Sequence, residues 1–192
     1  MTTEPGVSPL RLLAISGSLR ALSSNTALLR VAAEVAPSDV TISMYDGLAA
    51  LPHFNPDDDG DPPPPTVADL RERVGAADGL LICSPEYAHG VPGSLKNALD
   101  WLVRSVEFPF KPVALINASS MATHAQASLA ETLRTMSADV VPGSPFDAPL
   151  ERMSANGPPA AGAEATAAIR AALAALARAA AGADGEPAVR VE

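Results

Sequence analysis

Short apolar runs alternate along the chain with segments that carry apolar residues at helical spacing. The runs at 10–15, 79–84 and 112–116 are almost uniformly apolar, as in buried strands. The run at 40–44 alternates apolar with hydroxyl-bearing residues, as in a strand with one better-buried face, and 139–141 is a weaker last strand.

The intervening segments predict helices near 27–35, 66–76, 95–102, 122–136 and 163–181. Thr66 follows a run of prolines and is expected as the N-cap of its helix. The last helix is rich in alanine, and Ile169, Leu173 and Leu176 form its apolar seam. The Pro- and Asp-rich stretch 51–65 and the segment 149–162 are expected to be irregular.

Strands that alternate with helices indicate βαβ units and therefore a parallel sheet. The order and number of elements predict an α/β protein with a flavodoxin-like, doubly wound, five-stranded parallel sheet and helices on both faces. We expect one domain over 10–183, a flexible N-terminus over 1–9 and a flexible tail over 184–192.

Composition narrows the possible partners. The chain has 192 residues, of which 47% are hydrophobic and 18% charged, so it can build a core. Its net charge is −9 and its 13 basic residues are dispersed, which disfavours nucleic acid and anionic membranes as partners. Cys83 is the only cysteine, and no uninterrupted apolar run approaches the roughly 20 residues of a spanning helix, so we expect a cytoplasmic protein.

The loop after the first strand, 17–25, concentrates donors for an anion. Hydroxyls, an amide and a guanidinium stand just before a predicted helix, whose N-terminus also favours negative charge; the candidates are Ser18, Arg20, Ser23, Ser24 and Asn25. The patterns of a P-loop and of a dinucleotide fingerprint are both absent, which leaves the terminal phosphate of a mononucleotide or flavin. Alternatively, Ser23, Ser24 or Asn25 simply caps the helix and Arg20 is solvated.

The loop after the third strand follows Ser84 and begins with Pro85, Glu86, Tyr87, Ala88 and His89. Its prolines and glycines allow a sharp turn that could bring backbone N–H and C=O groups against a flat heterocycle. Taken alone, it could equally be a structural connection, with Tyr87 and Trp101 as core aromatics.

Together, the two loops resemble the NADPH-dependent FMN reductase family, whose members include flavin, quinone, azo-dye and chromate reductases. The family patterns are G-S-L-R-x-x-S-x-N and P-E-Y-N-x-x-x-P-G-x-L-K-N-A-x-D-W. The first is matched by Gly17, Ser18, Leu19, Arg20, Ser23 and Asn25, and the second by Pro85, Glu86, Tyr87, Pro92, Gly93, Leu95, Lys96, Asn97, Ala98, Asp100 and Trp101. The resemblance implies that the first loop holds the FMN phosphate and that Glu86, Tyr87 and their neighbours line the isoalloxazine.

Two departures from the family pattern concern the ring end of the site. Ala88 stands where the family has asparagine, so only backbone contacts remain there. The third loop, 117–124, lacks the glycines of many members; Ser119 and Ser120 could still donate hydrogen bonds, while Met121 and His124 could narrow the nicotinamide side.

The resemblance implies an enzyme that passes a hydride from NADPH or NADH through bound FMN to a small acceptor by a ping-pong mechanism. The acceptor would be a flavin, quinone, azo compound or metal oxyanion, and no protein side chain is expected to be catalytic because the cofactor carries the chemistry. A flavodoxin-like electron carrier and a flavin-free binding or regulatory protein of the same fold are the alternatives.

Two further expectations concern assembly and metals. The resemblance implies a homodimer or homotetramer, with Trp101, Leu102 and Val103 either at the interface or in the helix core. His53, His89 and His124 lie far apart in the sequence, so no metal site is expected, and His89 is a candidate substrate contact.

Overall fold

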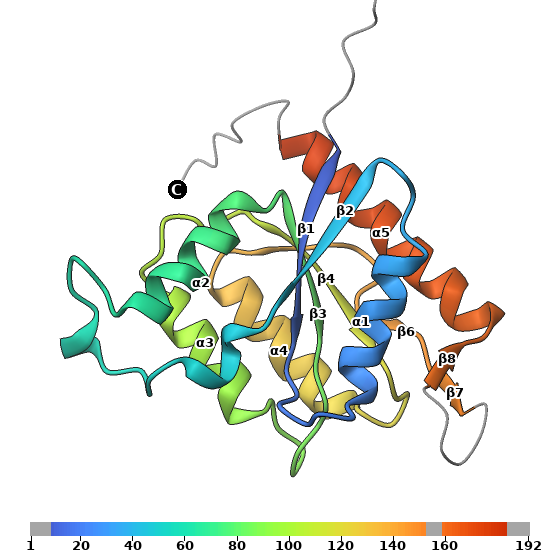
Figure 1. Ribbon diagram of the computed structural model, residues 1–192, viewed down its shortest axis with the longest axis horizontal. Coiled ribbons are helices and arrows are strands. Elements are labelled where there is room, and N and C mark those ends of the chain that lie inside the picture. The colour runs from blue at the N-terminus through green and yellow to red at the C-terminus, as the bar shows by residue number, and fades with distance from the viewer. Residues whose placement is uncertain (1–8, 153–158, 184–192) are drawn as a thin grey trace, which may run out of the picture.

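The centre of the molecule is a parallel sheet in the order β2-β1-β3-β4-β5 (Figure 1). Its strands are β1 (Leu10–Ser16), β2 (Val40–Tyr45), β3 (Gly79–Cys83), β4 (Pro112–Asn117) and β5 (Asp139–Val140). This computed structural model describes residues 9–152 and 159–183. Strands β3 and β4 are buried along their whole length, whereas β2, at the edge, alternates half-buried and exposed residues over 40–44. The predicted flavodoxin-like order is confirmed.

The fifth position of the sheet is filled by two short strands. β5 pairs with the start of β4, and β6 (Phe146–Asp147) pairs with its end. Between β5 and β6, the Ser144 hydroxyl accepts a hydrogen bond from the backbone N–H of Leu115 at 3.2 Å. It replaces the backbone carbonyl that would accept this bond in a continuous strand. Two prolines at 142 and 145 interrupt the strand because they have no N–H to donate, which is why the sequence shows only a weak last strand.

Helices cover both faces of the sheet, as predicted. α1 (Ser24–Glu34) and α5 (Ala163–Ala183) lie on one face, and α2 (Pro65–Ala76), α3 (Gly93–Leu102) and α4 (Thr123–Thr135) lie on the other (Figure 1). The residues expected to form apolar seams are buried, namely Leu95, Leu99 and Leu102 in α3 and Ile169, Leu173 and Leu176 in α5.

Two predictions about local structure, for Thr66 and for 149–162, are wrong, and a third, for 51–65, holds for most of its stretch. Thr66 is not an N-cap, because α2 already begins at Pro65, whose fixed φ and missing N–H suit the first helical position. The stretch 51–65 contains the 3₁₀ turn η2 (Pro56–Asp58), in addition to η1 (Gly47–Ala50) just before it. The segment 149–162 contains β7 (Leu150–Arg152) and β8 (Pro159–Ala161), which pair antiparallel.

Helix α5 is long and apolar enough over Ala163–Gly182 to cross a membrane, by length and composition alone. Its apolar side, however, packs against β3, β4 and β6, and Ile169 and Leu176 are fully buried there. These contacts make it a core helix of the described domain. The segments 1–8 and 184–192, on which the expectation of flexible ends falls, lie outside the described residues.

Candidate functional site

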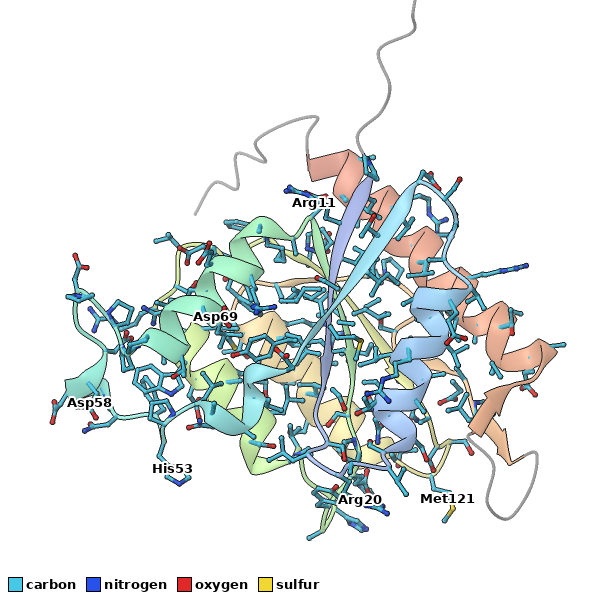
Figure 2. All side chains as sticks on the ribbon, in the orientation of Figure 1. Arg11, Arg20, His53, Asp58, Asp69 and Met121 are labelled. Atoms are coloured by element: carbon cyan, nitrogen blue, oxygen red, sulfur yellow. The ribbon has the colours of Figure 1, made fainter. Side chains whose placement is uncertain are left out.

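Three loops meet at the carboxyl edge of the sheet. Loop 1 follows β1 and covers 17–23, loop 2 follows β3 and covers 84–92, and loop 3 follows β4 and covers 118–122. Figure 2 shows Arg20 and Met121 at this edge, with Arg11 at the opposite end of the molecule. In a doubly wound sheet, ligands bind at this edge, near the point where the strand order reverses.

Loop 1 lies directly against loop 2 because residue 17 has no side chain. A Cβ atom on Gly17 would stand 2.7 Å from the Ser84 hydroxyl and 3.1 Å from the Leu95 side chain. The Gly17 N–H donates to the Cys83 carbonyl at 2.8 Å, which continues the β1–β3 ladder into the loops. The glycine of the family pattern is therefore explained by the close approach of the Ser84 and Leu95 side chains to the backbone of loop 1.

A hydroxyl network shapes the floor of loop 1. The Ser16 and Thr26 hydroxyls are 2.8 Å apart, which joins the end of β1 to the first turn of α1. The Ser18 N–H donates to the Ser16 hydroxyl at 3.3 Å, and the Ser18 hydroxyl accepts from the Arg20 N–H at 3.4 Å. Polar groups of loop 1 and of its neighbours thus hold the loop in place.

The candidate phosphate ligands divide into two groups. Ser23 is the N-cap of α1 and accepts from the Thr26 N–H at 3.4 Å, so the capping alternative holds for this residue. Asn25 accepts a hydrogen bond from the Cys83 thiol at 3.1 Å, while its amide N–H groups remain as donors. Ser24 and Arg20 are exposed, and within 9–152 and 159–183 the Arg20 side chain has no hydrogen bond or ion pair.

The first turn of α1 contains no acidic residue. The first N–H groups of a helix have no intrahelical partners, and the helix dipole makes this end positive. Exposed Arg20, the Ser24 hydroxyl and these N–H groups together form a donor set that suits a phosphate.

Loop 2 reverses direction in a tight turn. Tyr87 and Gly90 exchange two backbone hydrogen bonds, at 3.1 and 2.9 Å. The two residues between them are left-handed, with φ of 50° at Ala88 and 60° at His89. Tyr87 is 51% exposed, so it is not the core aromatic that one interpretation expected. The asparagine of the family pattern would suit the φ of position 88 better than alanine does.

Loop 2 is clamped to the start of α4. The Glu86 carboxylate accepts from the Ala125 N–H at 2.9 Å and caps a helix whose own N-cap, Ala122, makes no side-chain cap bond. Beneath it, the buried Gln126 amide donates to the Ser84 carbonyl at 3.2 Å. The carboxylate of Glu86 therefore holds loop 2 and α4 together, a role that the loop sequence alone did not reveal.

The structure brings together two histidines that are 35 positions apart in the sequence. The rings of His89, in loop 2, and His124, in the first turn of α4, stack with centroids 4.3 Å apart and planes at 9°. Both residues are exposed, as are Ser119, Ser120 and Met121 of loop 3. The sequence carried no signal for this pair, because nothing in it fixes how loops 2 and 3 face each other.

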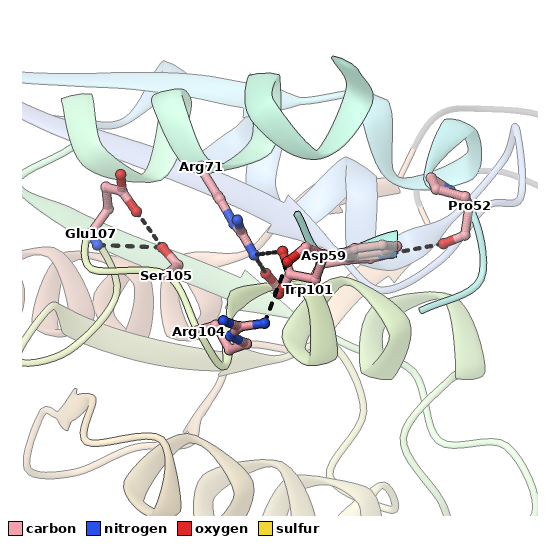
Figure 3. Close-up of polar contacts among 7 residues, drawn as sticks. All are labelled: Pro52, Asp59, Arg71, Trp101, Arg104, Ser105 and Glu107. Carbon is pink, nitrogen blue, oxygen red and sulfur yellow. Dashed lines mark hydrogen bonds and ion pairs between the residues drawn. The ribbon is translucent and has the colours of Figure 1, made fainter. Parts of the chain in front are cut away.

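Several residues of the second family pattern anchor the segment between β2 and α2. The Pro52 carbonyl accepts from the Trp101 indole N–H at 2.8 Å (Figure 3). It also accepts from the Asn97 amide at 2.8 Å, and the Asn97 side chain accepts from the Phe54 N–H at 2.7 Å. Trp101 and Leu102 are buried in the core of this chain, so they do not form an intersubunit surface, whereas Val103 is 60% exposed.

The same segment is fixed by a buried ion pair. The Arg71 guanidinium lies 2.8 Å from the Asp59 carboxylate and also donates to the Trp101 carbonyl at 2.7 Å (Figure 3). Arg104 donates to the Asp59 carbonyl at 3.4 Å. The Pro- and Asp-rich stretch is therefore an ordered cover over α2 and α3, away from the three loops.

A cavity of about 900 Å³ lies at the amino edge of the sheet, opposite the three loops. Three of its charged side chains are bonded within the chain: Arg11 bonds Asp78 at 3.0 Å, which lowers the pKa of that carboxyl, and the Lys111 ammonium donates to the Ala77 carbonyl. Burial lowers the pKa of Lys111. These contacts use the polar groups structurally, and the donor set for an anion lies at the other end of the sheet.

Comparison with known proteins agrees with the resemblance seen in the sequence. A family profile described as NADPH-dependent FMN reductase matches residues 10–151. The chain is 42% identical over 113 residues to a Pseudomonas aeruginosa protein named NAD(P)H-dependent FMN reductase, which covers 58% of this chain and 60% of that one. It is 39% identical over 117 residues to a quinone reductase of Escherichia coli, and this match covers 58% of this chain and 61% of that protein. The chain thus matches about 60% of the length of these relatives.

A solved structure extends the similarity over most of the chain. FerB, a flavoenzyme NAD(P)H:(acceptor) oxidoreductase from Paracoccus denitrificans, superposes with a TM-score of 0.76 at 26% identity and covers 88% of this chain and 98% of its own. The region that matches the family profile, residues 10–151, includes all three loops of the candidate site, since these lie between β1 and α4.

Proposed function

Because the chain belongs to the NADPH-dependent FMN reductase family, we propose that it is an oxidoreductase that passes a hydride from NADPH or NADH, by way of bound FMN, to a small acceptor in a ping-pong cycle. The observation that carries this proposal is the donor set of loop 1. It lies at the same edge of the sheet as the turn of loop 2, so one ligand with a phosphate at one end and a flat ring at the other fits both.

The phosphate end would be held by donors of loop 1 and of the first turn of α1. Arg20 would supply a charge-assisted contact, and the Ser18 and Ser24 hydroxyls would add neutral ones together with the first N–H groups of α1. Asn25 would contribute through its amide N–H, and Ser23 would act indirectly by capping the helix. The net charge of −9 does not oppose this, since binding depends on the local donors.

The ring end would lie against loops 2 and 3. Pro85 and Glu86 fix the start of loop 2, so that Tyr87, Ala88 and His89 would present backbone groups and an aromatic edge to the ring. Ser119 and Ser120 are exposed on loop 3 and would donate from the other side. When bound, FMN would supply the two-electron chemistry, and the chain's own residues would bind, orient and exclude water.

The direct test is a titration of the purified apoprotein with FMN, followed by absorbance and by quenching of flavin fluorescence. We expect stoichiometric binding, and we expect NADPH or NADH to bleach the bound flavin under anaerobic conditions. Addition of a quinone or free FMN should then restore the colour. A colourless protein that ignores FMN would overturn the proposal, and bound FMN that neither nicotinamide bleaches would favour the electron carrier.

Steady-state turnover would identify the acceptor class. NADPH and NADH are each compared with free FMN, a quinone, an azo dye and chromate as acceptors. Parallel double-reciprocal lines are expected for a ping-pong cycle, because the nicotinamide product leaves before the acceptor binds.

We further propose that the enzyme acts in the cytoplasm as a homodimer or homotetramer. The buried thiol of Cys83 is compatible with a reducing compartment. Val103, Val106 and Phe110 are 60–87% exposed beyond α3, and they offer apolar area for a second copy of the chain. Sedimentation of the purified protein, with Val106→Lys as the disrupting variant, would measure the assembly.

A further inference from the structure

The stacked rings of His89 and His124 are not needed to hold a phosphate or to cap a helix. We propose that this pair donates the proton that completes reduction of the acceptor, an inference that rests on the proposed function. His89 thereby gains a role beyond binding, and His124, which the sequence suggested only as a residue that narrows the nicotinamide side, gains a role in the chemistry.

The position of the pair is fixed by the loops that carry it. His89 occupies the tip of the loop 2 turn, and His124 occupies the first turn of α4. The Glu86 bond to the Ala125 N–H and the Gln126 bond to the Ser84 carbonyl join these two segments immediately beside the rings. The imidazoles therefore stand at the rim of the ring end, exposed and mutually oriented.

The reaction with a quinone needs one proton beyond the hydride. NADPH gives up two electrons and one proton as a hydride and becomes NADP⁺, and a quinone that receives this hydride is a hydroquinone monoanion. A second O–H bond must form, and we place the donated proton on an imidazolium N–H of the pair. That N–H bond breaks as the O–H bond forms, and the ring regains its proton from water.

The other side-chain types present in loops 1 and 2 are less suited to this task. A guanidinium and a phenol are both much weaker acids than an imidazolium, and the Glu86 carboxylate is occupied by the Ala125 N–H. Imidazole is the side chain that ordinarily changes charge between pH 5 and 8. Two imidazolium rings at this separation repel, whereas one protonated and one neutral ring can stack, so the pair suits a single proton.

The test compares an acceptor that takes up protons with one that takes up electrons only. The double variant His89→Asn/His124→Gln keeps a residue that tolerates left-handed φ in the turn and a helix former in α4. We expect the ratio of benzoquinone to ferricyanide turnover to fall about 10- to 100-fold, in the range of general acid catalysis. Because both rates come from one preparation, differences in FMN occupancy cancel in the ratio.

The pH profile and a matched control separate proton donation from a structural role. In the parent chain the ratio should fall as the pH rises through the range in which imidazoles lose their proton, and this dependence should be absent in the double variant. His53→Gln, the third histidine, is exposed on the segment before α2 and should leave the ratio and its pH profile unchanged. An unchanged ratio in the double variant would overturn the proposal.

An NMR titration, which needs no turnover, tests independently whether the histidine pair lies at the FMN site. The ring Cε1–H signals of the three histidines are assigned from the single variants and followed by NMR as FMN is added to the apoprotein. We expect the signals of His89 and His124 to move and that of His53 to stay. Signals that do not move although FMN binds would overturn the inference alone, whereas a protein that binds no FMN would overturn the proposed function as well.

Discussion

Arg20 is the residue whose role can be separated most cleanly from the fold, because its exposed side chain makes no hydrogen bond or ion pair in the part of the chain that the structure describes. Arg20→Ala should weaken FMN binding by about 10- to 100-fold, since a charge-assisted contact contributes roughly 1.5–3 kcal/mol. A fluorescence titration measures the change. Arg30→Ala, an exposed arginine further along α1, is the matched control and should bind FMN as the parent chain does.

Ala88, which stands where the family pattern has asparagine, adopts a backbone conformation that destabilises the fold locally. A left-handed φ of 50° disfavours a residue with a Cβ, and glycine removes the clash. Ala88→Gly should therefore raise the free energy of unfolding by about 1 kcal/mol, as measured by urea denaturation.

The control substitution should change the free energy of unfolding in the opposite direction. Ala127 is exposed within α4, where glycine is a poor helix former, so Ala127→Gly should lower stability by about 1 kcal/mol. Equal destabilisation by both variants would contradict the explanation given for Ala88.

Among single residues, the sequence identified donors better than it assigned their partners. Ser18, Arg20 and Ser24 could be predicted as donors because residue type and position before a helix suffice for that. The partners of Asn25, Glu86 and Asn97 could not be predicted, because each contacts an element that is remote in the sequence.

At the level of elements, α4 depends on a cap from another loop. Glu86→Ala should destabilise the protein by about 1–2 kcal/mol, because the first turn of α4 loses its acceptor, and Glu86→Gln should cost less because an oxygen remains. Urea denaturation measures the loss, and hydrogen exchange at the Ala125 amide localises it.

An exposed acid on the same helix serves as the control. Glu131→Ala should change stability by only a few tenths of a kcal/mol, since this residue is exposed and far from the N-terminus of α4. If Glu86→Ala were equally mild and left the exchange at Ala125 unchanged, the capping role would be wrong.

The main elements followed from periodicity, and the exceptions have identifiable causes. The last strand is split because prolines remove donors, and Ser144 replaces one backbone acceptor by its hydroxyl. The pairing of β7 with β8 has no local signal, since each strand is only three residues long and β8 consists of proline and alanine, which are depleted in strands.

For the whole molecule, the thiol of Cys83 reports on the integrity of the core. It is fully buried in β3, and burial raises the pKa of the Cys83 thiol, so the reactive thiolate is suppressed in the folded state. We expect iodoacetamide to leave Cys83 unmodified in native buffer and to label it in denaturing urea. Rapid labelling of the native protein would contradict this prediction.

The same reaction measures stabilisation by a ligand. At an FMN concentration 100 times its Kd, the folded state gains about 2.7 kcal/mol, so labelling through global unfolding should slow about 100-fold. Arg20→Ala should lose part of this protection at the same FMN concentration.

The sequence by itself determined the α/β class, the succession of strands and helices along the chain, and the loop that concentrates donors for an anion. These properties depend on local periodicity and on residue type before a helix, which a single chain reveals directly. Tertiary structure alone decided which of those donors are free, how Glu86 joins loop 2 to α4, and that His89 stacks on His124. The physical reason is that these contacts join segments far apart in the chain, and their geometry exists only once the sheet has brought the three loops to one edge.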